Sequence, residues 1–185
     1  MTETAPVITT VPQFVLDTEV DAVLDQQLRD LLSSCFTKPA DGMFRERRYW
    51  QEAPTAHWIV RDESGALIAH AALHEKTVGT KLGDLKIGGI GDVCVHPSQR
   101  GRGLVKVLLN AIHQHMFDKR IPFGMLFGDA GVYASSGYIS VINPLKYRDL
   151  YSGSTLIKSN PTLMIHPLGI TMWPPGTIDL RGPLF

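Results

Sequence analysis

The stretch IGDVCVHPSQRGRGLVKVLL, residues 90–109, is the part of the chain that decides the fold. It opens with an apolar run, Val93 to Val95, that predicts a buried strand. A basic, glycine-rich segment, Arg100 to Gly103, follows this strand, and a strongly periodic helix begins directly after it. At such a junction, backbone N–H groups without partners and the positive end of the helix dipole converge. The stretch therefore predicts a site for a ligand that carries phosphate.

The composition of the chain is that of an ordinary globular protein. Its 185 residues are 44% hydrophobic and 19% charged, and 18 basic side chains balance 18 acidic ones. This length suits a single domain, residues 1–185, with residues 1–10 as a frayed terminus and 168–185 as a Pro/Gly-rich tail. Because the formal charge is zero, we expect neither nucleic acid nor a membrane surface as a partner.

Signs of secretion, membrane insertion and metal binding are missing from the sequence. No apolar run is long enough to span a bilayer, and no basic segment followed by an apolar one opens the chain. The two cysteines, Cys35 and Cys94, lack the spacing of a metal site and suit a reducing compartment. We therefore predict a cytoplasmic protein without a metal, in which Cys94 packs as a small apolar residue.

Hydrophobic periodicity predicts the order of the helices and strands. Helices are expected over residues 21–36, 44–50, 104–120 and 129–136, the last closed by Gly137. Strands are expected over 14–16, 57–61, 66–73, 86–95, 122–127, 139–141 and 162–167, with a polar connection over 78–85. The arginines at 45, 47 and 48 then form a solvated face of the second helix.

This order predicts an α/β (or α+β) fold built on a mixed, mostly antiparallel central sheet with helices on both faces. The strands over 86–95 and 122–127 are separated by a helix and are expected to run parallel. Tight turns such as Asp62 to Gly65 make the earlier strands antiparallel. The segment Gly88-Gly89-Ile90-Gly91 is unsuited to a regular strand, and it indicates a bulge or the close approach of another backbone or a ligand.

The junction also resembles a known family. The pattern V-x-V-H-P-x-x-R-G-R-G-L is similar to the acyl-CoA signature of the GCN5-related N-acetyltransferases (GNAT), R/Q-x-x-G-x-G/A after a V-x-V strand. Arg100 to Leu104 match this signature, whereas Val105 stands where Gly or Ala is expected. The resemblance implies that the two parallel strands splay apart. It also implies that the pantetheine arm of acetyl-CoA, or of another acyl-CoA, lies between them.

The same resemblance assigns the donor site residue by residue. The pyrophosphate cradle would consist of Arg100, Gly101, Arg102, Gly103, Leu104 and Val105. Its backbone amides carry most of the binding, and the two arginines add charge. The backbone edge formed by Val93, Cys94 and Val95 would pair with pantetheine in the manner of an added strand.

A general acid follows from a second resemblance. The segment from Tyr133 to Tyr138 is similar to the family's Y-x-x-x-G-[FY] pattern, in which the tyrosine hydroxyl lies near the thioester sulfur. A phenol is protonated at neutral pH, and a departing thiolate needs one proton donor. Tyr133 is therefore the predicted general acid.

The candidate base is Asp92, which lies directly before the V-x-V strand. A carboxylate partly buried there would have a raised pKa and could accept the amine proton, directly or through water. It could equally bind the substrate ammonium, or point to the other face of the sheet and cap a loop. On the neighbouring strand, His70 and His74 would share one face while Glu75 lies on the other, and any of them could line the cleft.

Two narrower resemblances concern the acceptor. The segments Ile68 to Ala72, Val93 to Val95 and Leu104-Val105 are similar to those of the aminoglycoside 2′-N-acetyltransferases. The tail from Trp173 to Phe185 is similar to the end of the rhizobial nodulation protein A, an N-acyltransferase. Both resemblances imply an amino-sugar acceptor. The tail could instead be a terminal segment that packs on the fold.

These observations predict an acyl-CoA-dependent N-acyltransferase that moves acetyl to a primary amine of a small molecule by direct attack in a ternary complex. We expect a monomer or a homodimer. One alternative uses a longer acyl chain from CoA or an acyl carrier protein, for which Arg45, Arg47 and Arg48 would form a docking patch. A second alternative is a domain that binds acyl-CoA without catalysis.

Overall fold

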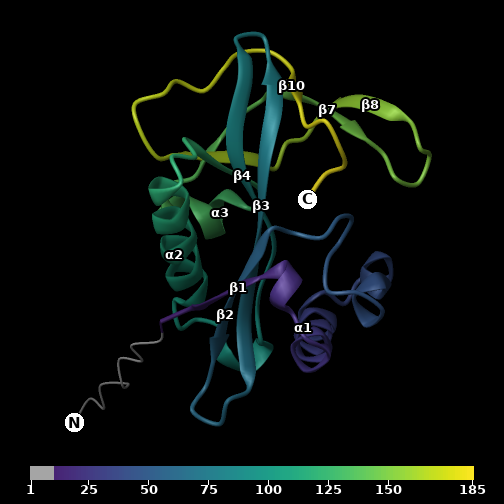
Figure 1. Cartoon of the computed structure of the whole chain (residues 1–185), viewed down its shortest axis with the longest axis vertical. Helices are drawn as coiled ribbons and strands as arrows, with labels where there is room; N and C mark the ends of the chain where they lie inside the picture. The colour runs from purple at the N-terminus through teal and green to yellow at the C-terminus, as the bar shows by residue number, and fades with distance from the viewer. Residues whose placement is uncertain (1–10) are drawn as a thin grey trace.

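The computed structural model describes residues 11–185, which form a ten-stranded sheet with helices packed on it (Figure 1). The strands are β1 (Gln13–Leu16), β2 (Ala56–Arg61), β3 (Leu67–Thr80), β4 (Gly83–Val95), β5 (Phe123–Phe127), β6 (Ile139–Ser140), β7 (Pro144–Arg148), β8 (Thr155–Ser159), β9 (Leu163–Pro167) and β10 (Ile178–Asp179). The α-helices are α1 (Ala22–Cys35), α2 (Leu104–Asp118) and α3 (Ala130–Tyr133). Short 3₁₀ helices are η1 (Asp17–Glu19), η2 (Pro39–Arg45), η3 (Pro97–Gln99) and η4 (Ala134–Ser136). The predicted frayed terminus, residues 1–10, lies outside the described residues, so a single domain over 1–185 stays a prediction.

The sheet is mixed, as the element order predicts. Strands β1 to β4 pair antiparallel in sequence order, β5 pairs parallel to β4, and β9 returns antiparallel to β5. Helices α1 and α2 lie on opposite faces of the long β3–β4 hairpin (Figure 1). Each buries one stripe: Leu28, Leu31 and Leu32 on α1, and Leu108, Ile112 and Met116 on α2. The predicted fold class is confirmed.

The β3–β4 hairpin is longer than the sequence predicts. The expected polar connection over residues 78–85 is wrong, because β3 continues to Thr80 and pairs with Gly83 at the start of β4. Val78 and Ile87 are both fully buried against the C-terminal segment, in a cluster that includes Ile178. This burial, supplied by residues a hundred positions away, stabilises strand where local composition favours a loop.

The second predicted helix, over residues 44–50, is also wrong. The helical turn is η2, which begins at Pro39 and ends at Arg45, and the Asp41 carboxylate accepts a 3.0 Å hydrogen bond from the Lys38 amide at its start. Proline at the first helical position and a capping carboxylate favour this earlier start. The chain beyond Arg45 bends, and the guanidinium of Arg47 donates to the main-chain oxygens of Tyr49 and Trp50.

The parallel strands separate where the site lies. Strands β4 and β5 pair only from Gly88 to Ile90 on β4 and from Gly124 to Leu126 on β5. Beyond this point β4 continues to Val95, and it bulges because two residues, Asp92 and Val93, lie opposite the single residue Ala71. The splay that the family resemblance implies is therefore present.

The glycines before the bulge admit the C-terminal segment. A Cβ atom at Gly89 would lie 2.7 Å from the ring of Phe185, and one at Gly91 would lie 3.2 Å from its main-chain carbon. Of the alternatives that the glycine-rich segment left open, both the bulge and the close approach of another backbone are found. The tail packs on the fold, and its last two residues also line a cavity at the site.

Candidate functional site

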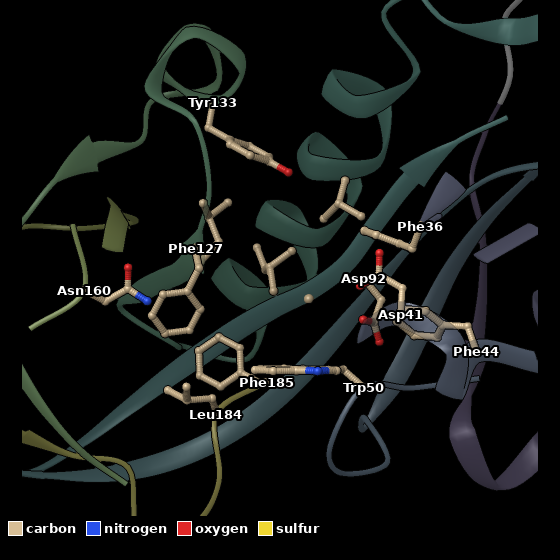
Figure 2. A pocket seen from close by; sticks show the side chains of 14 residues that line it. Phe36, Asp41, Phe44, Trp50, Asp92, Phe127, Tyr133, Asn160, Leu184 and Phe185 are labelled. Carbon is tan, nitrogen blue, oxygen red and sulfur yellow. The ribbon is translucent and has the colours of Figure 1, made fainter. Parts of the chain in front are cut away.

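Two adjoining cavities occupy the opening between β4 and β5. The first, which we call the loop cavity, has a volume of about 490 Å³ and lies at the start of α2. The second, the Asp92 cavity, has a volume of about 300 Å³ and lies on the C-terminal side of β5 (Figure 2). Phe36, Val93 and Tyr133 line both cavities, so the two spaces meet at these side chains.

The loop cavity brings together every residue predicted to bind the cofactor. Its lining includes Val93, Cys94, Val95, Arg100, Gly101, Arg102, Gly103, Leu104 and Val105. Gly101 and Gly103 have φ values of 75° and 74°, a conformation that side chains disfavour, and open space surrounds both. Gly103 caps α2 without a side chain, and the first helical hydrogen bond runs from the Val107 amide to the Gly103 oxygen, 3.1 Å. The three amides before Val107 are therefore left for a ligand.

Two arginines supply positive charge at this loop, and one valine occupies part of its space. The Nε atom of Arg100 donates to the Val95 oxygen at 3.3 Å, and Arg102 donates to the Gln99 side chain. Among the described residues neither arginine forms an ion pair, so both can meet an anion. Val105 is partly buried against the main core, and its isopropyl group narrows the cavity where the family pattern has Gly or Ala.

Cys35 is a cavity residue that sequence reasoning missed. Its thiol lies at the end of α1, donates to the Val95 oxygen at 3.3 Å and lines the loop cavity. Hydrogen bonding with the neighbouring thiol of Cys94 and with Ser34, together with the charge of Arg100, lowers the pKa of Cys35 to about 6. Cys94 is buried in a cluster with Leu31, as predicted for a small apolar residue. No spacing rule links residues 35 and 94, so only the tertiary structure could place them together.

Tyr133 points its hydroxyl group into the space where the two cavities meet (Figure 2). Its ring lies over Gly128, where a Cβ atom would collide with it. Burial raises the pKa of the Tyr133 phenol above its usual 10, so the group stays protonated at neutral pH. The second tyrosine of the motif, Tyr138, is buried, and its hydroxyl lies 3.0 Å from Nε2 of His113, so it belongs to the core.

Asp92 occupies the bulge in a left-handed conformation, with φ at 52°. Its carboxyl group lines the Asp92 cavity beside Val93. Burial raises the pKa of this carboxyl group to about 7, although the main-chain amide of Trp50 and the charge of Arg47 act in the opposite direction. A carboxyl group with this pKa is half ionised near neutral pH, which suits a group that accepts and returns a proton.

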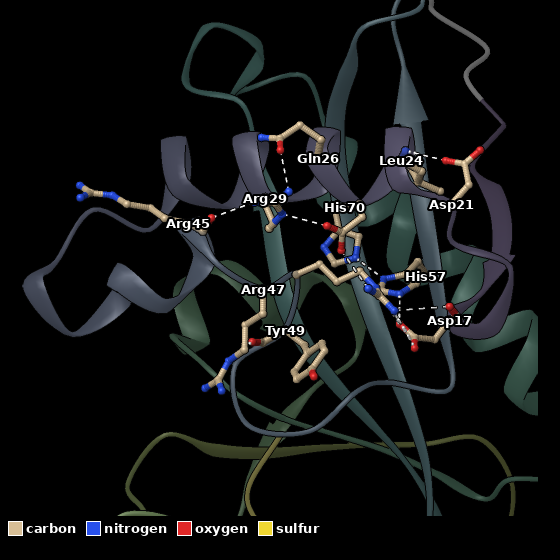
Figure 3. Close-up of polar contacts among 12 residues, drawn as sticks. Asp17, Asp21, Leu24, Gln26, Arg29, Arg45, Arg47, Tyr49, His57 and His70 are labelled. Atoms are coloured by element: carbon tan, nitrogen blue, oxygen red, sulfur yellow. Dashed lines mark hydrogen bonds and ion pairs between the residues drawn. The ribbon is translucent and has the colours of Figure 1, made fainter.

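A buried hydrogen-bonded chain supports the bulge from behind (Figure 3). Nδ1 of His70 lies 3.0 Å from the main-chain oxygen of Asp92. Nε2 of His70 lies 2.9 Å from Nδ1 of His57, and Nε2 of His57 lies 2.9 Å from Oδ1 of Asp17. Arg48 donates two hydrogen bonds to the same Asp17 carboxylate. The main-chain oxygen of Asp92 and the carboxylate of Asp17, at the two ends of this chain, can only accept hydrogen bonds. The three contacts therefore require three N–H hydrogens, whereas two neutral imidazole rings carry only two.

The other polar residues of β3 do not line the Asp92 cavity. His74 is buried, and its ring centroid lies 5.6 Å from that of Phe185. Glu75 lies on the other face, as predicted, and pairs with His115 of α2 at 3.0 Å and with Lys119, directly after α2, at 3.1 Å. The alternatives to Asp92 therefore have structural partners of their own.

Of the arginines predicted to form a solvated helix face, Arg45 and Arg47 are exposed, whereas Arg48 is partly buried, and the helix itself is absent. Arg48 pairs with Asp17 and Asp25 at 2.9 Å, and the guanidinium of Arg47 is bonded to main-chain oxygens. Sequence alone does not reveal these partners, because they lie on η1 and α1.

Two further searches concern ions and membranes. Within residues 11–185, no three His, Cys, Asp or Glu side chains come close enough together to hold a metal ion. No helix in this same part of the chain has the length and apolar character needed to cross a membrane.

Comparisons with known proteins support the fold. A family model described as an acetyltransferase (GNAT) domain matches residues 22–140. The GNAT family N-acetyltransferase YhbS of Escherichia coli, solved in complex with CoA, is 17% identical with a TM-score of 0.63, over 97% of this chain and 93% of that one. A GNAT family acetyltransferase of Brucella melitensis, solved in complex with acetyl-CoA, is 16% identical with a TM-score of 0.59, over 90% and 94%. At these identities the structures indicate a shared fold, and no curated protein matches the sequence significantly.

Proposed function

Because this chain belongs to the acetyltransferase (GNAT) domain family, we propose that it transfers an acyl group, acetyl first of all, from acyl-CoA to a primary amine of a small molecule. One observation carries this proposal: the hydroxyl group of Tyr133 lies where the loop cavity meets the Asp92 cavity. Donor and acceptor would therefore meet at a proton donor, with a carboxyl group on the acceptor side. The cytoplasm remains the expected compartment, and the oligomeric state, monomer or homodimer, remains open.

The donor would occupy the loop cavity. The free amides at the start of α2 and the side chains of Arg100 and Arg102 would hold the pyrophosphate. The pantetheine arm would lie along the unpaired edge of β4 from Val93 to Val95, which places the thioester near Tyr133.

The reaction would proceed by direct attack. The amine nitrogen attacks the thioester carbonyl carbon, the carbon–sulfur bond breaks, and an amide and CoA result. The Asp92 carboxylate takes the amine proton, directly or through water, and the Tyr133 hydroxyl gives its proton to the departing thiolate. No covalent enzyme intermediate is needed, because donor and acceptor would occupy the two adjoining cavities at the same time.

The alternative donors differ in what they require. An acyl carrier protein would need an exposed basic patch; Arg45 and Arg47 are exposed and could contribute to one, whereas Arg48 is committed to Asp17 and Asp25. A longer acyl chain on CoA would still use the loop cavity. An amino-sugar acceptor, which the aminoglycoside and nodulation-protein resemblances imply, would bring several hydroxyl groups into the Asp92 cavity.

The test measures turnover of acetyl-CoA with a panel of primary amines, and release of the CoA thiol reports the reaction. We expect Tyr133→Phe to lower kcat by about a hundredfold or more, the usual contribution of a general acid, with an unchanged Kd for CoA. Tyr151→Phe, at an exposed position in the β7–β8 turn, is the matched control. Activity with long-chain donors alone would favour the first alternative. Tight CoA binding without turnover of any amine would leave a non-catalytic binding domain.

A further inference from the structure

The lining of the Asp92 cavity indicates the chemistry of the acceptor. Besides Tyr133, five aromatic side chains line it: Phe36, Phe44, Trp50, Phe127 and Phe185. Its charged groups are the carboxyl groups of Asp41 and Asp92, and no Lys, Arg or His of the described chain takes part in the lining. A cavity that is aromatic and acidic without any cation suits a ligand that is apolar and positively charged.

The aromatic residues form two walls. On one side Phe36 and Phe44 lie with ring centroids 5.1 Å apart, and on the other Phe127 and Phe185 lie 5.5 Å apart. Figure 2 shows Trp50 between the two pairs, with its indole ring beside Phe185. Ring faces and edges on both sides of a small cavity suit a flat body between them.

The carboxyl groups mark the place of a single ammonium group. Asp41 and Asp92 both line the cavity, and Figure 2 shows both on its Trp50 side. One oxygen of Asp41 accepts from the Lys38 amide at 3.0 Å, which fixes this side chain and leaves its other oxygen for a ligand. An ammonium group here would meet negative charge and the face of an aromatic ring at the same time.

Resting on the acyl transfer proposed above, we propose that the acceptor is a monoamine with an aromatic or similarly flat apolar body, of the arylalkylamine class. Its ammonium group binds between Asp41 and Asp92, and its ring lies between the two aromatic walls. A polyamine would bring additional charges for which the cavity offers no further carboxylate. The cavity of about 300 Å³ is also at the small end for ligand sites, which suits one ring and a short chain.

The experiment compares acetyl-CoA turnover on four amines: 2-phenylethylamine, butylamine, glucosamine and spermidine. We expect kcat/KM for 2-phenylethylamine to exceed that for butylamine by about fivefold, because aromatic contacts contribute about 1 kcal/mol beyond burial. Trp50→Leu keeps apolar volume but removes a ring face, so it should bring this ratio close to one. Tyr151→Ala, at an aromatic side chain that is 81% exposed and outside the cavity, should leave the ratio unchanged.

The outcomes separate this inference from the function on which it rests. Turnover with the highest kcat/KM on glucosamine or spermidine overturns the inference and leaves the acyl transfer standing. An equal loss on every amine in Trp50→Leu overturns it as well, because a general loss of structure does not depend on the ring of the substrate. Normal CoA binding without turnover of any amine overturns the proposed function, and the inference with it.

Discussion

The Nδ1 atom of His70 lies 3.0 Å from the main-chain oxygen of Asp92, at the residue where β4 bulges. A carbonyl oxygen only accepts, so Nδ1 of His70 carries the hydrogen of this bond. Burial lowers the pKa of His70 to about 3, which leaves the ring neutral, so its Nε2 atom, 2.9 Å from Nδ1 of His57, carries no hydrogen. The left-handed conformation of Asp92 costs about 1 kcal/mol or more on its own. We infer that His70 is a positioning residue, which holds the Asp92 carboxyl group toward the acceptor.

Replacement of His70 should therefore act through Asp92. His70→Leu removes the donor, and we expect kcat to fall about tenfold while the Kd for CoA stays unchanged, as is common when a supporting hydrogen bond is lost. His70→Asn retains an N–H group near the position of Nδ1 and should recover much of this loss. The measurement is kcat as a function of pH for both variants. Equal profiles for His70→Leu and His70→Asn, or a loss of CoA binding in both, would contradict the positioning role.

The pH dependence of the wild-type protein should report Asp92. Burial raises the pKa of its carboxyl group to about 7, so the base becomes ionised and kcat/KM rises as the pH increases through this value. Asp92→Asn should remove this limb and lower the plateau by about a hundredfold, the usual contribution of a general base. Deprotonation of the amine substrate also changes kcat/KM with pH, but this contribution is the same for the wild type and Asp92→Asn. An unchanged profile in Asp92→Asn would exclude Asp92 as the titrating group.

The donor half of the site could be predicted from the sequence because its residues are contiguous. The segment Arg100 to Val105 joins a strand to a helix, and the glycines reveal both the turn and the exposed amides. Asp92 directly precedes the V-x-V segment of β4, so the same local pattern leads to the residue at the bulge. Tyr133 follows the next parallel strand, whose direction was predictable from the helix between the two strands.

The acceptor half could not be predicted, since distant segments supply it. Phe36 directly follows α1, Trp50 lies in the segment after η2, and Phe185 is in the C-terminal tail. No periodicity relates these positions, and the segment that includes Trp50 is an irregular bend where a helix was predicted. The hydrogen-bonded chain of Asp17, His57 and His70 could not be predicted for the same reason. Its members lie on η1, β2 and β3 and come together only in the folded protein.

Val105 offers a test of the cradle. Its partly buried isopropyl group lines the loop cavity, where the family signature has Gly or Ala. Val105→Ala should widen the cradle and lower the Kd for CoA a few-fold, and alanine also favours the helix. Calorimetric titration with CoA measures this change. Val107→Ala, two residues further along α2 and outside the lining of the loop cavity, is the control. Weaker CoA binding in Val105→Ala would show that the valine side chain supports the cradle instead.

Cys35 should report occupation of the loop cavity. Its thiol is partly exposed and its pKa is lowered to about 6, so the thiolate that forms when the hydrogen bond to Val95 is given up reacts with iodoacetamide. Saturating acetyl-CoA, which has no free thiol to consume iodoacetamide, should slow this alkylation by about tenfold or more, since the ligand would cover the thiol. Mass spectrometry of the labelled peptides separates Cys35 from Cys94, which is buried. Alkylation of Cys35 at the same rate with and without acetyl-CoA would place the cofactor elsewhere.

Acid should destabilise the protein through its buried histidines. Burial lowers the pKa of His70 and His74 to about 3 and that of His113 to about 4. The unfolded chain binds protons below pH 6.5 that the folded chain does not, so these groups lower stability as the pH falls from 6.5 towards 4. Asp92 acts in the opposite sense between pH 7 and its ordinary pKa of 3.8, because the folded chain binds its proton more tightly.

Three histidines outweigh one carboxyl group, so the free energy of unfolding, measured in urea at pH 7.5, 6 and 5, should fall toward acid. His113→Gln, away from both cavities, should flatten this decline by up to about 1.4 kcal/mol per pH unit, the contribution of one titrating group. Asp92→Asn should steepen it, because the opposing contribution is lost. Identical slopes in the wild type and His113→Gln would mean that His113 titrates alike in the folded and unfolded chains.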